Sequence, residues 1–468
     1  MKIHLIAIGG TGMGALAGLL RQAGHEVRGS DGPLYPPMST LLDQLQIPRF
    51  EGFNGRNLDW GPDRVVVGNI CRVDHVEAAA ARERGLQLTS FPALLSELFL
   101  GERHPLVVAG THGKTTTASI MAHLLTAAGR DPGYLIGGIP RDLERSFALG
   151  APPFFVVEGD EYDCAYFDKR PKFVHYRPRT VILTGVEYDH ADIYPDLAAV
   201  ERAFAMLVER VPAEGRILVW ADCELAVTLA RAGAAAVETY SATDGVDADW
   251  RARCATHVGG RQQLTVTHGG RPALSFELGL AGRHNAANAL GVAAAALGLG
   301  IEAEAVARAL GSFSGVRRRQ EVRGRAAGVT VVDDFAHHPT AIAETLDGLR
   351  GVHGEGRLVA VFEPRSATSR RAVFQERFAE ALARADHAVI AGLHAPEGIP
   401  AEQRLDPRRV AERVSALGGQ GRHLEGVQPI VDHLVQLCEP GDTVVVMSSG
   451  AFGGLHQALL RALQERGR

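Results

Sequence analysis

Residues 107–118 read Val-Val-Ala-Gly-Thr-His-Gly-Lys-Thr-Thr-Thr-Ala and join an apolar β-strand pattern to a helical pattern through two glycines. In such a turn the glycines let backbone N–H groups curl around a phosphate, and the start of the following helix adds positive potential. Lys114 would neutralise the β- and γ-phosphates of a nucleotide, and the Thr115 hydroxyl would be a ligand of Mg²⁺. The spacing is shorter than usual, because Gly110 lies only three residues before Gly113. The stretch predicts a nucleotide-binding strand, loop and helix of an α/β fold, and an incidental glycine turn is a minor alternative.

The alternation of apolar strands, turns and helical patterns begins three times along the chain, at residues 3–8, 106–109 and 329–332. This rhythm is typical of α/β domains with parallel sheets, and a length of 468 residues corresponds to roughly three domains. A run of arginines within Gly315–Arg319 interrupts the hydrophobic pattern, so we place a hinge near it. The predicted organisation is an N-terminal Rossmann-like domain, a central P-loop ATPase-like domain with a parallel sheet and a C-terminal Rossmann-like domain, over residues 1–104, 105–321 and 322–468.

The composition is that of an ordinary globular protein, with 46% hydrophobic and 22% charged residues. A formal net charge of −5 provides no general basic field, so neither nucleic acid nor an anionic membrane surface is expected as a partner. No apolar run approaches the roughly 18 residues of a membrane span, and the N-terminus does not resemble a signal peptide. The five cysteines include no Cys-x-x-Cys pair, as is usual for reduced thiols. We therefore expect a cytoplasmic protein. A monomer or a weak homo-oligomer is also expected, although none of these features determines the oligomeric state.

Two further strand patterns end in acidic residues. Phe154–Val157 is followed by Glu158, and Val181–Leu183 is followed, after a short turn, by Glu187 and His190. The carboxyl ends of parallel strands share one edge of a sheet, so these side chains would lie near the phosphate loop and could reach its metal. Each pattern taken alone is weak, because acidic strand ends are commonly solvated and a single histidine is more often structural.

Two stretches later in the chain carry side chains suited to nucleotide contacts. Residues 282–288 open an Ala-rich helix in which two asparagines, three residues apart, would share one face and could bond a base or a ribose. Residues 331–339 contain two adjacent acids and two adjacent histidines. Adjacent histidines on one loop seldom converge on one ion, so we prefer contacts with a nucleotide over a metal site.

The N-terminal glycines form a second candidate for diphosphate binding. Gly9, Thr11, Gly12 and Gly14 follow the first strand pattern, and Asp31 stands 22 positions after Gly9 at the end of the next strand. A dinucleotide fits this arrangement only weakly, because the glycines lack the Gly-x-Gly-x-x-Gly spacing of dehydrogenases. The diphosphate of another ligand fits equally well, and an oxidoreductase is a minor alternative.

The order and spacing of these motifs resemble the Mur ligases, the ATP-dependent amide ligases of peptidoglycan synthesis and recycling. The resemblance covers essentially the whole chain. Three long stretches, which the L-alanine-adding branch of the family does not share, resemble the branch that adds a murein peptide, namely residues 35–40, 161–179 and 362–368. Residues 191–210 contain no lysine, so the carbamylated lysine of several relatives is expected to be absent, and Gly185 stands where the family usually has asparagine.

The resemblance implies that the first domain binds UDP-N-acetylmuramate, the second binds ATP and Mg²⁺, and the third closes with the incoming amine. The implied reaction has two steps. The lactyl carboxylate of UDP-N-acetylmuramate attacks the γ-phosphate of ATP to give an acyl phosphate, and the amine of the murein tripeptide L-alanyl-γ-D-glutamyl-meso-diaminopimelate then displaces phosphate from it. Two alternatives stay open, a UDP-N-acetylmuramate:L-alanine ligase and a binding module that changes shape with ATP and catalyses nothing.

The resemblance also implies roles for single residues. The catalytic positions would be Lys114 and His190, with Lys114 stabilising the transferred phosphoryl group. Mg²⁺ would be held by Thr115, Glu158 and His190. ATP would be bound by Gly110, Thr111, His112, Gly113, Lys114, Thr115, Thr116, Asn288, Arg318 and Asp334. The UDP-sugar would be held by Gly9, Thr11, Gly12, Gly14 and Asp31. Arg365 is the candidate contact for an acceptor carboxylate, and a structural role for this arginine weighs nearly as much.

Overall fold

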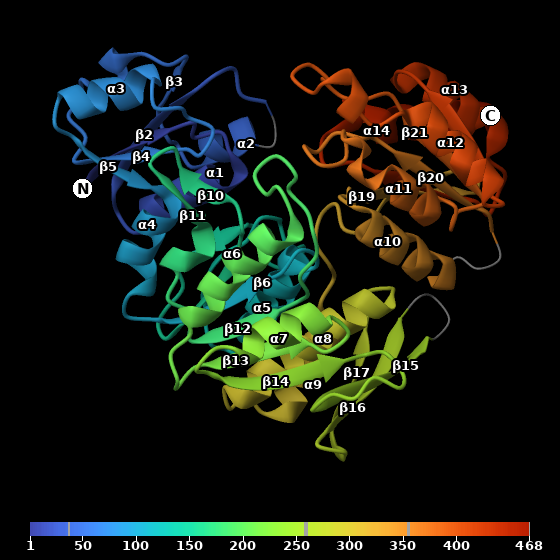
Figure 1. The fold of residues 1–468 in the computed structure, drawn as a ribbon, viewed down its shortest axis with the longest axis horizontal. Helices are drawn as coiled ribbons and strands as arrows, with labels where there is room; N and C mark the ends of the chain where they lie inside the picture. The colour runs from blue at the N-terminus through green and yellow to red at the C-terminus, as the bar shows by residue number, and fades with distance from the viewer. Residues whose placement is uncertain (36–37, 257–260, 353–355, 468) are drawn as a thin grey trace.

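The described part of the chain contains three large β-sheets with helices packed against them, and one two-stranded hairpin (Figure 1). The computed structural model describes residues 1–35, 38–256, 261–352 and 356–467. The three sheets follow one another along the chain, so the α/β class and the three-part organisation predicted from the sequence are confirmed. The exact domain limits, at residues 104 and 321, stay predictions.

The N-terminal sheet has five parallel strands in the order β3-β2-β1-β4-β5. This is the strand order of a Rossmann fold without its sixth strand, a fold in which ligands bind at the carboxyl ends of the strands. The strands are β1 (Lys2–Ile6), β2 (Glu26–Asp31), β3 (Arg49–Glu51), β4 (Arg64–Val67) and β5 (Gln87–Ser90). The helices are α1 (Thr11–Gln22), α2 (Met38–Gln44), η1 (Gly55–Leu58), α3 (Val76–Glu83), α4 (Phe91–Leu95) and η2 (Ser96–Leu100).

The central sheet has ten strands in the order β17-β16-β15-β14-β13-β12-β6-β9-β7-β8. Its strands are β6 (His104–Ala109), β7 (Gly133–Leu135), β8 (Phe147–Ala148), β9 (Phe154–Gly159), β12 (Thr180–Leu183), β13 (Arg216–Trp220), β14 (Ala236–Ser241), β15 (Trp250–Thr256), β16 (Gln262–His268) and β17 (Arg271–Leu278). A separate hairpin is formed by β10 (Asp163–Ala165) and β11 (Asp168–Pro171). The helices are α5 (Lys114–Ala127), η3 (Lys172–His175), α6 (Leu197–Glu209), α7 (Glu224–Arg231), α8 (Arg283–Gly298) and α9 (Ala303–Ser312).

The C-terminal sheet has six strands in the order β18-β19-β23-β20-β21-β22. Its strands are β18 (Glu321–Ala326), β19 (Val329–Asp334), β20 (Leu358–Phe362), β21 (His387–Ala391), β22 (Gln420–Leu424) and β23 (Thr443–Met447). Its helices are α10 (Pro339–Val352), η4 (Ala372–Phe374), α11 (Gln375–Leu382), η5 (Ala401–Gln403), α12 (Pro407–Ala416), α13 (Val427–Leu437), η6 (Phe452–Gly454) and α14 (Leu455–Arg466).

The central and C-terminal sheets are parallel through their middle but have antiparallel strands at their edges, which the sequence did not predict. Strands β15, β16 and β17 pair antiparallel, as do β7 with β8 and β18 with β19. Two-residue turns explain two of these hairpins. Gly269 and Gly270 join β16 to β17, and Ala327 and Gly328 join β18 to β19, all four with positive φ. Such turns suit the twist of antiparallel strands.

The buried core fixes the phosphate loop between a sheet and two helices. Apolar side chains of β6 and β9 are buried against α5 and α8, whose alanines allow close packing. The N-terminal part is anchored on the central part by Phe147 of β8, because a Cβ on Gly18 of α1 would lie only 2.0 Å from its ring. Among the described helices, we find none with both the length and the apolar character that crossing a membrane requires.

Candidate active site

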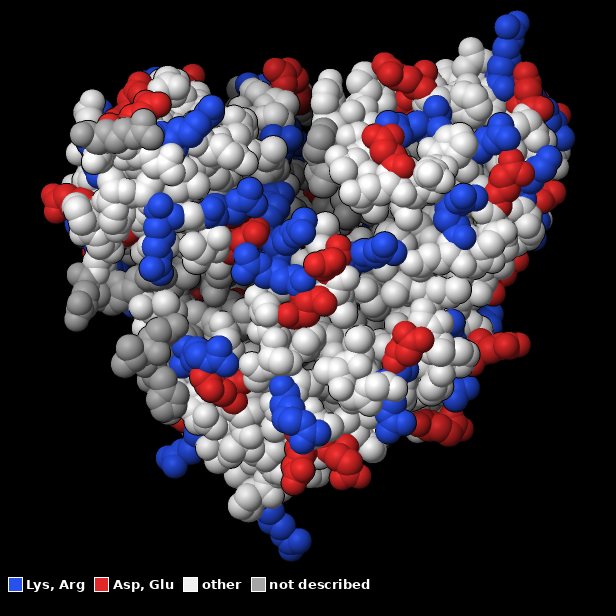
Figure 2. All heavy atoms as spheres, turned by 180° about the vertical axis from the view of Figure 1, so that it is seen from behind, with Lys and Arg blue, Asp and Glu red and all other residues white. Residues whose placement is uncertain are grey.

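A cleft of about 1670 Å³ runs along the carboxyl edge of the central sheet and is lined by residues from all three parts of the chain. Seven of the lining side chains are basic, Lys114, Arg145, Lys172, Arg317, Arg318, Arg319 and Arg323. Figure 2 shows, from behind, Lys and Arg side chains gathered below the notch between the two upper lobes. Nine other lining residues are Asp or Glu, so the cleft offers cations that suit phosphates beside carboxylates that suit a metal ion.

Most of the site residues expected from the sequence line this cleft. They are Thr11, Gly12, Thr111, His112, Gly113, Lys114, Thr115, Thr116, Glu158, His190, Asn288, Arg318 and Asp334. Five expected residues are outside the lining, namely Gly9, Gly14, Asp31, Gly110 and Arg365. The structure therefore brings together, in one cleft, side chains as far apart in sequence as Thr11 and Asp334.

The loop between β6 and α5 depends on two glycines with positive φ. Gly110 has a φ of 134°, and a Cβ there would lie 2.3 Å from Thr184 Oγ1. Gly113 has a φ of 79°, and a Cβ there would lie 2.8 Å from Asn288 Oδ1. Side chains at both positions would therefore be strained and would collide. Because α5 begins at Lys114, its free N–H groups face the loop and can meet an anion.

Lys114 and His190, the two expected catalytic positions, are joined by the carboxylate of Glu161. The Lys114 ammonium donates to Glu161 Oε2 at 3.0 Å and to the Gly110 carbonyl oxygen at 2.6 Å. His190 Nε2 lies 2.9 Å from Glu161 Oε1. Glu161 is only 2% exposed, so its charge depends on these partners.

The ionisation of the three groups follows from their mutual contacts. Burial raises the pKa of Glu161, but Lys114 and His190 lower it by more, so the pKa lies below its ordinary value. Burial lowers the pKa of Lys114, yet the carboxylates of Glu161 and Asp160 leave it above its ordinary value. The pKa of His190 is also raised, because its bond to Glu161 outweighs burial. The cluster is therefore a buried network with a charged lysine beside the loop.

Thr115 and Glu158 meet directly below the loop. The Thr115 hydroxyl donates to Glu158 Oε2 at 3.2 Å, and the Gly137 N–H donates to Glu158 Oε1 at 2.7 Å. Burial raises the pKa of Glu158 above its ordinary value. A hydroxyl and a carboxylate are hard oxygen donors of the kind that Mg²⁺ prefers, so this pair fits the expected ion. His190 contacts Glu161 instead of this pair. The Glu161 carboxylate therefore places two further oxygen atoms near the loop.

The side chains of adjacent arginines in the run before β18 point in different directions. Arg318, the expected nucleotide contact, donates from Nη2 to the carbonyl oxygens of Ser448 and Gly450 at 2.7 and 2.6 Å. Arg319 reaches the loop itself, with Nη2 at 3.4 Å from Thr115 Oγ1. The family resemblance implied a role for Arg318 and none for Arg319, because the sequence does not show which side chains of an irregular run point toward the loop.

Asp334 and Asn288 lie at the cleft but already have structural contacts. Asp334 accepts the N–H groups of Gln320 and Ala336, both at 2.7 Å, so it fastens the hinge segment to the end of β19. Burial raises its pKa above the ordinary value. The Asn288 amide lies under Gly113, so α8 supports the loop from below.

His112, Glu187 and His338 form a contact between the phosphate loop and the C-terminal part. Glu187 Oε2 lies 3.8 Å from His112 Nε2 and 3.9 Å from His338 Nδ1. The Thr340 hydroxyl at the start of α10 donates to Glu187 Oε2 at 2.8 Å. The neighbouring His337 bonds the Phe335 carbonyl oxygen instead. The two adjacent histidines thus have different partners.

The N-terminal glycines divide into packing and cleft positions. Asp31 Oδ2 accepts the Gly9 N–H at 2.7 Å and Oδ1 accepts the Gly32 N–H at 2.8 Å, so this carboxylate holds the turn together. A Cβ on Gly9 would meet Leu34, and one on Gly14 would meet Met38, both at 2.2 Å. Thr11 and Gly12 are the members of this turn that face the cleft.

Arg365 stands beside the cleft, against the loop that follows β23. Its Nη1 lies 3.4 Å from His394 Nδ1 and 3.8 Å from Glu363 Oε1. A Cβ on Gly450 would lie 2.2 Å from Arg365 Nε. The same Gly450 carbonyl accepts from Arg318, so the two arginines flank one loop.

Comparison with known proteins identifies the arrangement. Three family models match in succession, "Mur ligase family, catalytic domain" over residues 2–103, "Mur ligase middle domain" over 108–296 and "Mur ligase, glutamate ligase domain" over 318–450. The UDP-N-acetylmuramate--L-alanyl-gamma-D-glutamyl-meso-2,6-diaminoheptandioate ligase of Escherichia coli (strain K12) is 43% identical over 468 residues, which cover 100% of this chain and 99% of the relative. The UDP-N-acetylmuramate--L-alanine ligase of Desulfosudis oleivorans is 34% identical, over 99% of this chain and 98% of the relative.

A solved structure supports the same grouping. The murein peptide ligase of Psychrobacter arcticus 273-4 shares 37% sequence identity and superposes with a TM-score of 0.73, covering 99% of each chain. Sequence relatives and structure agree over the full length, including the segments that carry the cleft. The chain belongs to the Mur ligase family.

Proposed function

We propose that the protein is a cytoplasmic ATP-dependent ligase that joins the lactyl carboxylate of UDP-N-acetylmuramate to the amine of L-alanyl-γ-D-glutamyl-meso-diaminopimelate, in peptidoglycan recycling. The observation that carries the proposal is the buried Lys114–Glu161–His190 network beside a phosphate loop, in a cleft to which all three parts of the chain contribute. Family membership supports the ATP-dependent formation of an amide bond. The murein peptide as acceptor is supported by the 43% identical relative, whose name includes that peptide.

In the first step a lactyl carboxylate oxygen attacks the γ-phosphorus of ATP, and the bond from that phosphorus to the β–γ bridging oxygen breaks. ADP leaves, and an acyl phosphate remains. Lys114 and the N–H groups at the start of α5 would stabilise the negative charge that moves during this transfer. The network with Glu161 holds the ammonium in place before the substrate arrives, so little reorganisation is needed.

In the second step the peptide amine attacks the acyl carbon, loses a proton, and displaces phosphate. An acyl phosphate is hydrolysed by water, so the cleft must close before it forms. Arg318 and Asp334 lie where the C-terminal part meets the hinge, and we propose that they contact the ribose and phosphates of ATP on closure, while Asn288 meets the adenine. Closure would thereby complete the site only when nucleotide is bound.

Mg²⁺ fits the oxygen atoms of Thr115 and Glu158, with His190 as the further ligand that we propose. When bound, the ion would neutralise charge on the β- and γ-phosphates. His190 would need to turn from Glu161 toward the ion, since its Nε2 is engaged in this structure.

Replacing Glu158 with glutamine is expected to raise the Mg²⁺ concentration for half-maximal activity by at least about 10-fold, because a metal ligand is lost. ADP release measured against Mg²⁺ concentration checks this. Glu144→Gln is the matched control, because Glu144 is an exposed acid at the same cleft without a bond to Thr115. An unchanged Mg²⁺ dependence in Glu158→Gln would remove this residue from the metal site.

The substrates would occupy the two ends of the cleft. We propose that the turn of Gly9, Thr11, Gly12 and Gly14 cradles the diphosphate of the UDP-sugar, with Asp31 holding that turn on the uridine side. Arg365 would contact a carboxylate of the acceptor peptide. The protein would work as a monomer or a weak homo-oligomer.

Two other functions make different predictions. A UDP-N-acetylmuramate:L-alanine ligase is supported by the 34% identical relative that carries this name, and it would prefer the single amino acid as acceptor. A module that only changes shape with ATP would bind nucleotide without forming a product. The buried charged network around the loop disfavours the second alternative, because a passive site does not need to hold a charged lysine and a histidine on one buried carboxylate.

Release of ADP by the purified protein tests the proposal, with ATP, Mg²⁺ and UDP-N-acetylmuramate and with either the tripeptide or L-alanine. We expect rapid release with the tripeptide and little with L-alanine. Preference for L-alanine would identify the protein as a UDP-N-acetylmuramate:L-alanine ligase. No release of ADP with either acceptor would refute the ligase function.

A further inference from the structure

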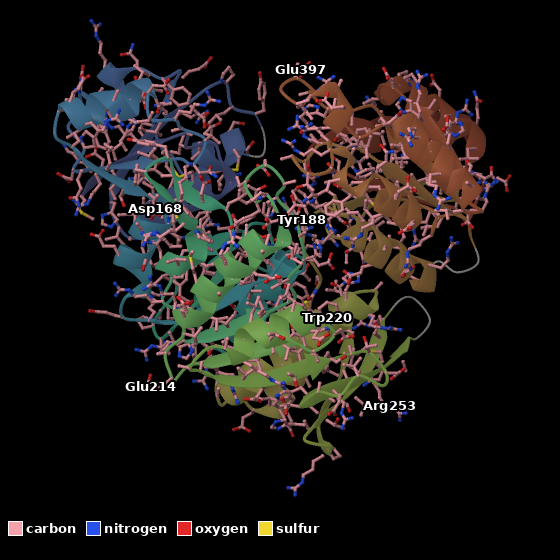
Figure 3. All side chains as sticks on the ribbon, in the orientation of Figure 1. Asp168, Tyr188, Glu214, Trp220, Arg253 and Glu397 are labelled. Carbon is pink, nitrogen blue, oxygen red and sulfur yellow. The ribbon has the colours of Figure 1, made fainter. Side chains whose placement is uncertain are left out.

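Trp220 is a large, partly exposed aromatic side chain in the cleft that neither the phosphate loop nor the metal ligands account for. It is the last residue of β13, and Figure 3 shows it on the side of the central part that faces the C-terminal part. Strand β13 pairs with β12, which pairs with β6, the strand that leads into the phosphate loop. Two strand spacings amount to about 10 Å, the length scale of the sugar and base that a bound triphosphate carries.

The indole ring packs on the segment that follows β12, and the same segment also bonds the phosphate loop. A Cβ on Gly185 would lie 3.1 and 3.4 Å from Cε3 and Cζ3 of Trp220, so the ring packs directly on the backbone of that glycine. The Gly185 carbonyl oxygen accepts the Thr111 N–H at 2.9 Å. The position of the ring is therefore coupled to the loop that would hold the phosphates.

Trp220 shares the cleft lining with aromatic and neutral polar side chains and with one acid close in sequence, Asp222. Tyr240 is the register partner of Trp220 on β14, and α8, which carries His284 and Asn288, packs against β13 and β14; all three residues line the cleft. Burial lowers the pKa of His284 to about 4, so its imidazole is uncharged near pH 7 and offers one donor and one acceptor. The opposite side of the phosphate loop carries the acids Glu158, near the end of β9, and Asp160, just after it, which suit a metal ion rather than a base.

We infer that Trp220 is the platform on which the purine base of the nucleotide stacks, and that it contributes to base selectivity, with Asn288 and His284 at the edge of the base. The inference rests on the proposed ATP-dependent function. Stacking a base on an aromatic ring favours any base with an aromatic face, and the polar groups at its edge then distinguish adenine from guanine. Because the base takes no part in the transfer, its contacts act alike on ground and transition states.

Loss of the indole should therefore weaken nucleotide binding and leave turnover nearly intact. Trp220→Ala is expected to raise KM for ATP by about 10-fold or more, with kcat nearly unchanged. Trp220→Phe, which keeps an aromatic face, should recover most of the affinity. Trp250→Phe is the matched control, since Trp250 is buried in β15 and stacks on His268 at 4.0 Å between ring centroids.

Tryptophan fluorescence separates this inference from the proposed reaction, because it needs no turnover. The chain has three tryptophans, at 60, 220 and 250. ADP should quench the emission of the wild-type protein and of Trp250→Phe, inorganic tripolyphosphate should not, and the ADP response should disappear in Trp220→Phe. A response that persists in Trp220→Phe, or an unchanged KM in Trp220→Ala, would overturn the inference even if the ligase is active. A protein that responds to ADP through Trp220 but forms no product would refute only the reaction.

Discussion

Replacing Lys114 with methionine is expected to lower kcat for ADP release by about 10³-fold, the scale seen when a single charge-stabilising donor is removed from an active site. Methionine is unbranched and only one heavy atom shorter than lysine, and it removes the charge. The loop would still present its backbone N–H groups and the start of α5, so ATP binding should persist in part. Steady-state kinetics with the tripeptide as acceptor, together with a nucleotide-binding titration, measures both quantities.

Lys169→Met is the control for this experiment. Lys169 is also paired with an acid, Asp163, but 68% of its side chain is exposed and it lies on the β10–β11 hairpin. Its loss should leave kcat almost unchanged. A Lys114→Met protein that turns over within a few-fold of the wild type would show that the phosphoryl group is stabilised elsewhere.

Replacing Glu161 with glutamine is expected to lower the free energy of unfolding by about 3 to 5 kcal/mol, because it leaves the buried ammonium of Lys114 without its counter-charge. Glu161 and Lys114 side chains are 2% and 15% exposed, so little solvent is available to compensate. Activity should fall as well, since both Lys114 and His190 lose the group that orients them. Urea unfolding of the ligand-free protein measures the stability change.

A double-mutant cycle shows whether the loss of stability in Glu161→Gln comes from its ion pair with Lys114. The Lys114→Met, Glu161→Gln double variant should be destabilised by clearly less than the sum of the single variants, since neither charge is then left unpaired. Glu304→Gln is the surface control, since Glu304 pairs with Arg308 and their side chains are 93% and 74% exposed, and a change of about 0 to 1 kcal/mol is expected for it. Additive effects of the two single changes would contradict a direct buried pair.

The parts of the site that follow from the sequence are those in which neighbouring residues act together. In residues 107–118 the strand, the glycines and the lysine are consecutive, so the pattern alone places Lys114 at the start of a helix, and the structure has β6 end at Ala109 and α5 begin at Lys114. The parallel alternation also predicts that the acids after β9 and the histidine after β12 reach the same edge as the loop. Thr115 and Glu158 do meet there.

The parts that the sequence could not predict depend on the direction of single side chains or on distant pairing. Glu161 lies 47 residues from Lys114, and only the fold shows that it joins Lys114 to His190. Arg319 and Arg318 are adjacent in an irregular segment, and Arg319, the one not expected, reaches Thr115. Asp31 is expected beside the UDP-sugar, and only the fold shows that its carboxylate bonds the backbone of its own turn.

The antiparallel strands at the sheet edges were not predicted for a related reason. Alternating strands and helices indicate parallel pairing, but a two-residue turn such as Gly269–Gly270 reverses the chain and adds an antiparallel strand. Strands β15, β16 and β17 lie away from the phosphate loop along the sheet order, whereas the antiparallel strand β19 ends at Asp334, which lines the cleft.

The most direct test of the central claim is to identify the product when both acceptors compete. The protein would be incubated with ATP, Mg²⁺, UDP-N-acetylmuramate and equal concentrations of the murein tripeptide and L-alanine, and the UDP-linked products would be identified by mass spectrometry. The account predicts UDP-N-acetylmuramoyl-tripeptide as the main product, formed in step with ADP and lost in Lys114→Met. A main product that carries only L-alanine would contradict the proposed acceptor, and the absence of any new UDP-linked product would contradict the ligase itself.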